Sequence, residues 1–233
     1  MESPDRRTTR ILALVLLLAV AAAYSGTYRL GFTTLDDPSY VTKNPHIADG
    51  LSREAIAWAF ISHHSANWHP LTWISHMLDV EVYGLRPAGH HLTSVVLHIV
   101  NTLLLFVVLL VMTGCVWRSA FVAAVFGLHP LHVESVAWVS ERKDVLSTLF
   151  WMLAMLAYVR YVRGRDGDRP LRTWYVRGRG GDRPLRKYVR GRGGDRSLRG
   201  AFAAYALMVV LYALGLMAKP MLVTLPIVLM LVD

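Results

Sequence analysis

The fold is decided first by the stretch Ile11-Leu-Ala-Leu-Val-Leu-Leu-Leu-Ala-Val-Ala-Ala-Ala-Tyr-Ser-Gly-Thr-Tyr-Arg-Leu-Gly-Phe32. It carries no charge before Arg29 and is long enough to cross a hydrocarbon core, which takes about 20 residues. Arg6, Arg7 and Arg10 precede it, as in a signal peptide, but the run exceeds the usual apolar centre of roughly 7–15 residues and lacks a clear cleavage site. We therefore interpret residues 11–32 as a retained transmembrane helix that follows a short N-terminal segment, 1–10.

Further apolar runs follow this first one. They lie at about 91–113, 119–128, 145–162 and 202–217, and a sixth, at 221–232, reaches the end of the sequence before it could span. The run after Ser119 is short and stops at His129-Pro130, which favours a tilted or broken helix that lines a cavity. Together with the 54% hydrophobic composition, these runs predict an all-α, polytopic membrane protein. We expect the sequence to be the front part of a larger protein.

The distribution of charge predicts the topology. The formal net charge is +9, but Arg160 to Arg199 alone holds 14 Lys/Arg and 4 Asp, so the other residues sum to about zero. This excludes a generally nucleic-acid-seeking protein. Basic loops stay cytoplasmic, as does an arginine-rich N-terminus. The loop 33–90, the segment 129–144 and Lys219 are then expected on the outer face. Transmembrane helices 2–4 are expected within residues 91–162, and helix 5 and a truncated helix 6 within residues 201–233.

The basic loop, residues 163–200, is an internal repeat. Tyr161–Arg172 recurs as Tyr175–Arg186 and, with Ser197 in place of proline, as Tyr188–Arg199. A tether for anionic lipid or RNA is one interpretation of this loop. We favour a solvated, disordered expansion that serves as a topology signal, because the repeat is rich in Gly and Arg and too short for a solenoid unit. The single cysteine, Cys115, excludes an internal disulfide framework and a cysteine-based metal site.

The first outer loop, 33–90, contains the strongest chemical signal. It begins with the adjacent carboxylates Asp36 and Asp37, and its later parts have helical apolar spacing with Ser52 as a helix cap, which predicts amphipathic helices in the head-group zone. Two like charges at one site raise the pKa of at least one carboxyl, which suits a general base or a pair that holds a cation. The alternative is a turn signal, because Asp-Pro favours turns.

A second polar group occupies residues 129–144. His129, His132 and Glu134 could ligate a metal, although their spacing fits no familiar site. Arg142 and Lys143 are positive charges on the predicted outer side, against the usual trend, which points to an anion such as a lipid phosphate. Lys219 stands alone between two apolar runs, where an ammonium group is costly unless it is paired or functional. The histidines at 90, 91 and 98 are interpreted as packing groups.

Five motifs in order carry a family resemblance. They are Leu35-Asp-Asp-Pro-Ser-Tyr-Val, Trp68-His-Pro-Leu-Thr, Gly89-His-His-Leu-Thr-Ser-Val-Val-Leu-His98, His129-Pro-Leu-His-Val-Glu-Ser-Val and Gly215-Leu-Met-Ala-Lys-Pro220. Their order resembles the membrane domain of the transmembrane and tetratricopeptide-repeat-containing O-mannosyltransferases and their bacterial relatives. These enzymes have the C-type, polyprenyl-phosphate-dependent glycosyltransferase fold. The resemblance covers most of residues 30–160 and 201–233.

The resemblance implies a function. Asp36 and Asp37 match an acidic pair that acts on the acceptor, which would be a protein or glycan hydroxyl, and the donor would be a sugar on a polyprenyl phosphate. The site would face the outside, on the periplasmic side of a bacterial inner membrane. Arg142, Lys143 and Lys219 are then expected to bind the donor phosphate. Further candidates for substrate binding are His69, His129, His132 and Glu134. No metal site is assigned, although the acidic pair could hold a divalent cation.

Two features depart from the family pattern. The arginine-rich insertion replaces a short connection, and no tetratricopeptide repeats follow within the sequence. We therefore expect these residues by themselves to be inactive. Two other functions stay open: a non-catalytic membrane anchor for a C-terminal repeat domain, and a metal or haem transporter that uses the ten histidines. A transporter would need histidines facing one another deep within helices, whereas here they cluster near the outer boundary.

Overall fold

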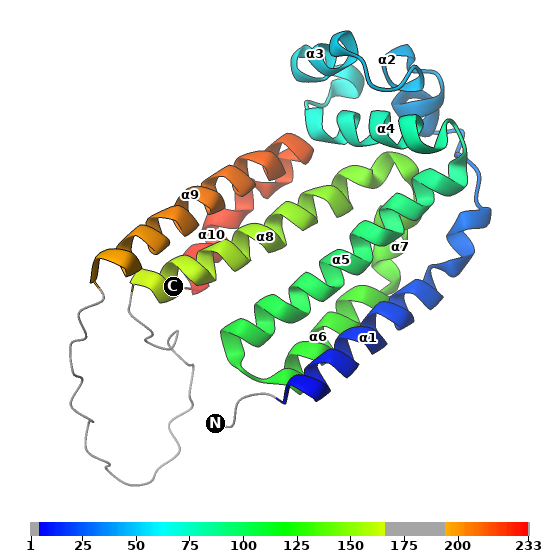
Figure 1. Cartoon of the computed structure of the whole chain (residues 1–233). Coiled ribbons are helices and arrows are strands. Elements are labelled where there is room, and N and C mark those ends of the chain that lie inside the picture. Colours follow the sequence, from blue (N-terminus) through cyan, green and yellow to red (C-terminus); the bar gives the residue numbers. More distant parts are fainter. Residues whose placement is uncertain (1–4, 166–193, 233) are drawn as a thin grey trace, which may run out of the picture.

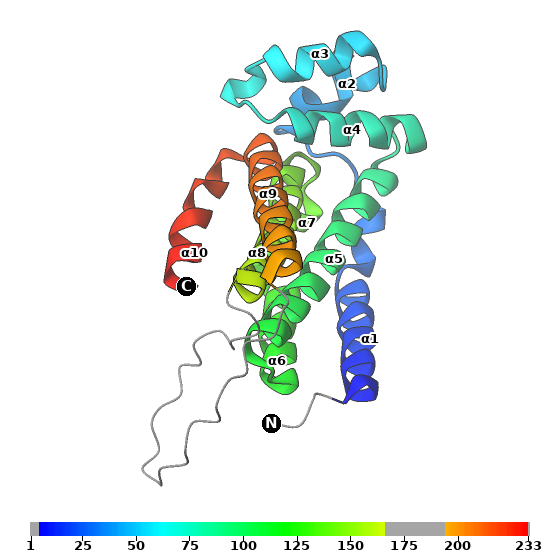
Figure 2. The same cartoon turned by 60° about the vertical axis from the view of Figure 1, so that its left-hand side comes forward.

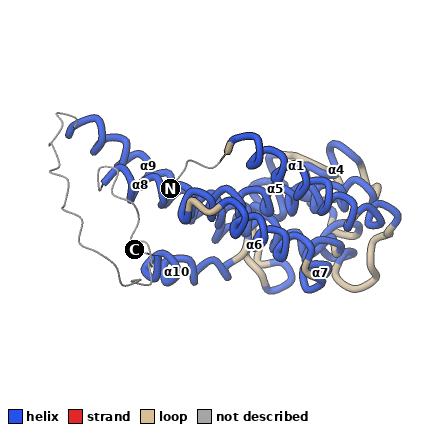
Figure 3. The backbone as a smooth tube through the Cα atoms, turned by 90° about the horizontal axis from the view of Figure 1, so that it is seen from below, coloured by secondary structure: helices blue, strands red, loops and turns tan. Residues whose placement is uncertain are grey.

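The computed structural model describes residues 5–165 and 194–232, and within them every regular element is helical, as Figure 3 shows. The prediction of an all-α polytopic membrane protein is confirmed. Four helices of this part are long and apolar enough to cross a membrane, at residues 6–29, 87–113, 139–163 and 200–218. The repeat loop predicted at 163–200 lies mostly outside the described residues.

The elements follow one another in a simple order. Their bounds are α1 Arg6–Ala23, η1 Ser25–Arg29, η2 Pro38–Thr42, α2 Pro45–Ala48, α3 Arg53–Ile61, η3 His64–Ala66, α4 Pro70–Tyr83, α5 Pro87–Thr113, α6 Val116–Leu128, η4 Pro130–His132, α7 Val133–Ala137, η5 Val139–Glu141, α8 Arg142–Arg165, α9 Gly194–Ala218, η6 Pro220–Thr224 and α10 Leu225–Val232.

Local chemistry sets several helix ends. The first helix begins at Arg6 because the Asp5 carboxylate accepts hydrogen bonds from the backbone N–H groups of Arg7 and Thr8, so it starts before the apolar run itself. The longest helix, α5, begins with Pro87, whose missing N–H costs nothing at a first helical position. It ends at Gly114, which adopts φ +68°, a conformation that glycine takes without strain.

The long helices form a bundle that is covered at one end. The start of α1 and the end of α8 lie at the same end of the bundle, and α2, α3 and α4 lie across the opposite end (Figure 1). The same arrangement is visible after rotation, with α9 beside α8 and α1 beside α5 (Figure 2). We call α2–α4 together with η2 the cap. The cap is the feature that positions the functional residues.

The short run after Ser119 is a broken span. Here α6 stops at Leu128, and the chain bends by 50° before it continues through η4 and α7. The break occurs at Pro130, which cannot continue the hydrogen-bond ladder of the helix. Close helix contact needs a small residue just before it: a Cβ at Gly127 would lie 2.7 Å from Val20 Cγ2 and 2.9 Å from Thr102 Oγ1. The helices α1, α5 and α6 therefore meet at this glycine.

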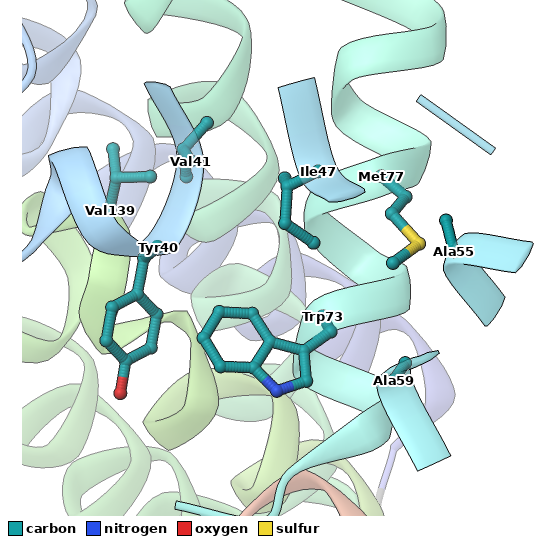
Figure 4. Packing of buried hydrophobic residues seen from close by; sticks show 8 residues of the cluster. All are labelled: Tyr40, Val41, Ile47, Ala55, Ala59, Trp73, Met77 and Val139. Atoms are coloured by element: carbon teal, nitrogen blue, oxygen red, sulfur yellow. The ribbon is translucent and has the colours of Figure 1, made fainter. Parts of the chain in front are cut away.

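The cap has an aromatic core of its own. Trp73 of α4 is fully buried and its ring centroid lies 4.7 Å from that of Tyr40, as Figure 4 shows. Ser52 caps α3 by accepting a hydrogen bond of 3.0 Å from the Ala55 N–H, as its sequence position predicts. Large apolar side chains remain exposed on the outer sides of α3 and α4, among them Ile56, Phe60, Ile61, Leu78 and Val82. This is the pattern of helices that lie in a membrane interface.

Candidate functional site

The structure separates the two adjacent aspartates. The Asp37 carboxylate is fully buried and accepts hydrogen bonds from the Thr33 N–H at 2.7 Å and the Ser140 N–H at 3.0 Å. Asp36 is exposed, and within the described residues its carboxylate makes no hydrogen bond or ion pair. Asp37 therefore joins the start of the cap to the segment that leads into α8, and Asp36 remains open to a reactant.

A charged and aromatic group lies at the junction between the cap and α8. The Lys143 ammonium lies 5.1 Å from the Tyr40 ring centroid and is paired with Glu141 at 2.6 Å. Burial raises the pKa of Tyr40 to about 12, with smaller contributions from the negative charges of Glu141 and Asp36. Tyr40 is therefore a neutral phenol at physiological pH. These contacts place a carboxylate, a phenol and a lysine at one junction between the cap and α8.

His69 lies beneath this junction. Its ring stacks on Tyr40 with centroids 5.6 Å apart, it is 1% exposed, and neither ring nitrogen has a hydrogen-bond partner among the described residues. Burial lowers the pKa of His69 to about 4, and the positive charges of Lys143 and Lys219 lower it further. His69 is thus a neutral imidazole that can accept or donate one hydrogen bond. The positive charges of both lysines therefore act on this imidazole.

Lys219 lies at the rim of a cavity of about 260 Å³ and forms an ion pair with Asp144. The Thr72 hydroxyl of α4 donates a hydrogen bond of 2.9 Å to the Ala218 carbonyl, so the cap holds the backbone next to this lysine. The polar residues that line the cavity are His98, Asn101, His132, Ser135, Asp144, Ser147, Thr148 and Lys219. The apolar residues are Phe126, Val145, Trp151, Met221 and Leu222. The cavity is therefore lined by both polar and apolar side chains.

Arg142 is placed differently from the two lysines with which the sequence grouped it. Its guanidinium is fully buried and donates to Asp79 Oδ2 at 2.7 Å, to the His90 carbonyl at 2.6 Å and to the hydroxyls of Ser94 and Ser75. We call these groups the Arg142 clamp. The clamp ties α4 and α5 to the start of α8. All of the guanidinium nitrogens are engaged, so the structure gives Arg142 a structural position away from the cavity.

The remaining predicted residues are divided between the cavity and the surface. His132 lines the cavity, whereas His129 and Glu134 are exposed and are not among its lining residues. The Nδ1 atom of His129 accepts a hydrogen bond from the Leu131 N–H at 3.2 Å, which caps η4. The structure therefore does not gather His129, His132 and Glu134 at one point.

One buried group has the composition of a metal site. Ligand atoms of His76, Asp79 and His90 all lie within 4.8 Å of one another. However, both Asp79 oxygens are already in use, because Oδ2 accepts from Arg142 and Oδ1 accepts from Thr93 at 2.7 Å. A divalent ion would also meet the fixed guanidinium charge in a dry site, which is strongly unfavourable. The geometry therefore favours an internal ion pair over a metal here.

Sequence reasoning missed two functional carboxylates. Asp79 stands in the helical stretch Pro70–Tyr83, where most neighbours are apolar. It lies three residues after His76, on the face that the helix buries, and a buried acid needs a partner. Asp144 ends the polar segment 129–144, but nothing in the sequence linked it to Lys219, 75 residues away. Such pairs are decided by helix packing.

The fold and this site define a multi-pass, all-helical membrane protein with an interfacial cap and a cavity that is lined by polar residues, Lys219 among them. No family model matches the chain, and no solved structure matches it. Curated proteins do match. The chain is 36% identical over 109 residues to Protein O-mannosyl-transferase Tmtc2 of Drosophila melanogaster, which covers 46% of this chain and 12% of that protein.

Two other relatives show the same similarity. The chain is 31% identical to Protein O-mannosyl-transferase TMTC2 of Homo sapiens, over 50% of this chain and 14% of that protein. It is also 31% identical to Protein O-mannosyl-transferase TMTC1 of Mus musculus, over 64% of this chain and 17% of that protein. The resemblance drawn from the five motifs is thereby confirmed. The matched regions cover well under a fifth of the length of these relatives.

Two buried histidines, His69 just before α4 and His76 within it, make stability depend on pH. Burial lowers the pKa of His69 to about 4 and that of His76 well below its ordinary value of 6.5. The unfolded chain binds protons at these imidazoles at a higher pH than the folded chain does. We therefore expect the free energy of unfolding to be constant above about pH 6.5 and to fall as the pH drops from 6.5 towards 4.

Denaturant titrations in detergent micelles at pH 7.5, 6 and 5 measure this dependence. His69→Gln is expected to flatten part of the slope, and His63→Gln, a change at an exposed histidine of the same cap, should leave it unchanged. A slope that His69→Gln does not alter would show that His69 does not titrate in this range.

Proposed function

We propose that the chain forms the catalytic membrane part of a glycosyltransferase that moves a sugar from a polyprenyl-phosphate carrier to a hydroxyl of a protein or another exported molecule. The relatives, named as protein O-mannosyl-transferases, support the reaction class. The observation that carries the proposal is the group at the junction of the cap and α8, where Lys143 lies 5.1 Å from the ring centroid of Tyr40 and Tyr40 stacks on His69. Both lysines act electrostatically on the same imidazole, and Asp36 acts on the phenol that stacks on it.

The chemistry of this arrangement fits sugar transfer. An acceptor hydroxyl must lose a proton as it attacks the anomeric carbon, and the exposed Asp36 carboxylate is the base that can take it. The departing lipid phosphate gains negative charge, which ammonium groups stabilise when they are fixed in place beforehand. Lys219 is fixed by the Thr72–Ala218 hydrogen bond, and Lys143 by Glu141. His132, which lines the cavity, can then hydrogen-bond a sugar hydroxyl.

Transfer by the full-length protein in membranes tests the proposal. The assay would follow a radiolabelled polyprenyl-phosphate mannose to protein acceptors. Lys219→Met is expected to lower the rate by at least about tenfold, because a charge-assisted hydrogen bond to phosphate is lost. Lys43→Met, which removes an exposed lysine of the cap, is the matched control and should retain the full rate. Equal transfer in both variants, or no transfer by the wild-type protein, would favour the non-catalytic anchor.

The outer-face location is a separate part of the proposal. The charge distribution supports it, and the structure places the start of α1 and the end of α8 at the end of the bundle opposite the cap (Figure 1). Because Cys115 is the single cysteine, Cys115→Ser provides a clean background in which Asp36→Cys reports its side of the membrane. We expect an impermeant maleimide to label residue 36 in intact bacterial cells. Labelling that requires permeabilised cells would place the site in the cytosol and contradict the mechanism.

A further inference from the structure

We infer that Asp144 competes with a lipid phosphate for Lys219, so that this carboxylate sets the affinity of the cavity for its anionic ligand. The inference rests on the proposed function for the identity of the ligand. The Lys219 ammonium forms its ion pair with Asp144 Oδ1 at the cavity rim, and both side chains are about a quarter exposed. An incoming phosphate therefore meets a cation that already has an anionic partner.

Asp144 keeps other stabilising contacts when Lys219 turns to a phosphate. Its Oδ2 accepts a hydrogen bond of 2.9 Å from the Ser135 hydroxyl. It also lies in the first turn of α8, where the unsatisfied N–H groups of a helix start favour a negative charge. Lys219, in contrast, has no second carboxylate partner among the described residues. When Lys219 exchanges Asp144 for a phosphate, Asp144 therefore keeps its other contacts and the phosphate gains the ammonium as a partner.

The rest of the cavity fits a phosphate that carries both a polar group and an apolar chain. His132 offers a hydrogen bond to a head group, while Trp151, Met221 and Leu222 offer apolar surface to a chain. A free phosphate would use only the polar part of this lining. We therefore assign the cavity to the phosphate head of a lipid, with the chain directed towards Met221 and Leu222.

Binding of citronellyl phosphate, a short polyprenyl phosphate, to the full-length protein in micelles tests this inference. Asp144→Asn keeps the shape of the side chain and removes its charge. It should tighten binding by at least about fivefold, because the Lys219 ammonium is freed from one opposite charge, which at about 4 Å is worth this much even in a water-like dielectric. Lys219→Met should weaken binding by about tenfold or more, and the double variant should behave like Lys219→Met because Asp144 acts through the lysine.

Controls separate this effect from folding and from a general change in charge. Asp144→Glu keeps the charge and should bind close to wild type, and Asp49→Asn removes an exposed carboxylate of the cap and should have no effect. Inorganic phosphate should bind at least tenfold more weakly than citronellyl phosphate, and equal affinity would overturn the assignment to a lipid. Binding that Asp144→Asn weakens or leaves unchanged, in a protein with wild-type thermal stability, would overturn the competition itself.

The outcome is independent of the transfer assay. If the wild-type protein transfers no sugar but Asp144→Asn still tightens citronellyl phosphate binding, the proposed function fails and the lipid-phosphate site stands. If transfer occurs and Asp144→Asn does not change binding, the inference fails and the proposed function stands.

Discussion

Arg142→Met is expected to lower the free energy of unfolding by about 3–5 kcal/mol, because it leaves the Asp79 carboxylate buried without its partner. The guanidinium lies 2.7 Å from Asp79 Oδ2 and both side chains are almost fully excluded from solvent. The variant also leaves Ser94 and the His90 carbonyl without a donor. The Arg142 clamp is where α4 and α5 meet α8, so the damage should spread to the whole cap.

Denaturant-induced unfolding of the purified protein in micelles measures this loss. Asp79→Asn should lower the free energy of unfolding by a similar amount, because it leaves the buried guanidinium without its carboxylate partner. The double variant Arg142→Met/Asp79→Leu should recover much of the stability, because replacing a buried ion pair by apolar groups is often neutral. Arg53→Met, at an exposed arginine of the cap, is the matched control. A double variant as unstable as the sum of the single ones would show that the ion pair is not the source of the effect.

Asp36→Asn is expected to lower sugar transfer by about 10²–10⁴-fold while leaving stability within about 0.5 kcal/mol of wild type. The amide cannot take a proton from an acceptor hydroxyl, and the Asp36 side chain is exposed with no structural contact among the described residues. Asp37→Asn should behave in the opposite way. Each oxygen of its carboxylate accepts a hydrogen bond from one backbone N–H group. An amide has only one oxygen and can accept only one of these bonds, so the free energy of unfolding should fall by about 1–3 kcal/mol.

The two aspartates are therefore distinguished by two measurements on the same variants, transfer in membranes and unfolding in micelles. Asp36→Glu should restore part of the transfer, because it returns the carboxylate at a shifted position. If Asp37→Asn abolished transfer without any loss of stability, the roles of the two residues would be reversed. If neither change lowered transfer, the acidic pair would not contain the base.

The fold was largely predictable from the sequence because membrane spans depend on local composition. An apolar run of sufficient length must satisfy its backbone internally, and so the helices at 6–29 and 87–113 follow from the residues that form them. Helix ends were less predictable. The start of α1 depends on the Asp5 cap, and the extent of α9 depends on helical residues that precede its apolar run. Such contributions are small compared with the membrane signal.

The candidate site was only partly predictable, and the charged residues show why. Asp36, Asp37, Lys143 and Lys219 were identified by type and position, and the structure places Lys143 and Lys219 near the same imidazole. Arg142 is adjacent to Lys143 in sequence and would be expected to share its function. On a helix, however, consecutive residues point about 100° apart, so one side chain faces the junction and the other enters the space between α4 and α5.

The membrane crossings, the charged residues at their boundaries and the family resemblance could all be inferred from the sequence, because these properties reside in composition, order and short motifs. The partners of the charges could be identified only once the helices were packed. Asp79 with Arg142 and Asp144 with Lys219 are separated by 63 and 75 residues, and each pair is selected by the packing of helices around it. Burial then gives each pair its role: the first is excluded from water and holds the cap, and the second lies at the cavity rim within reach of a ligand.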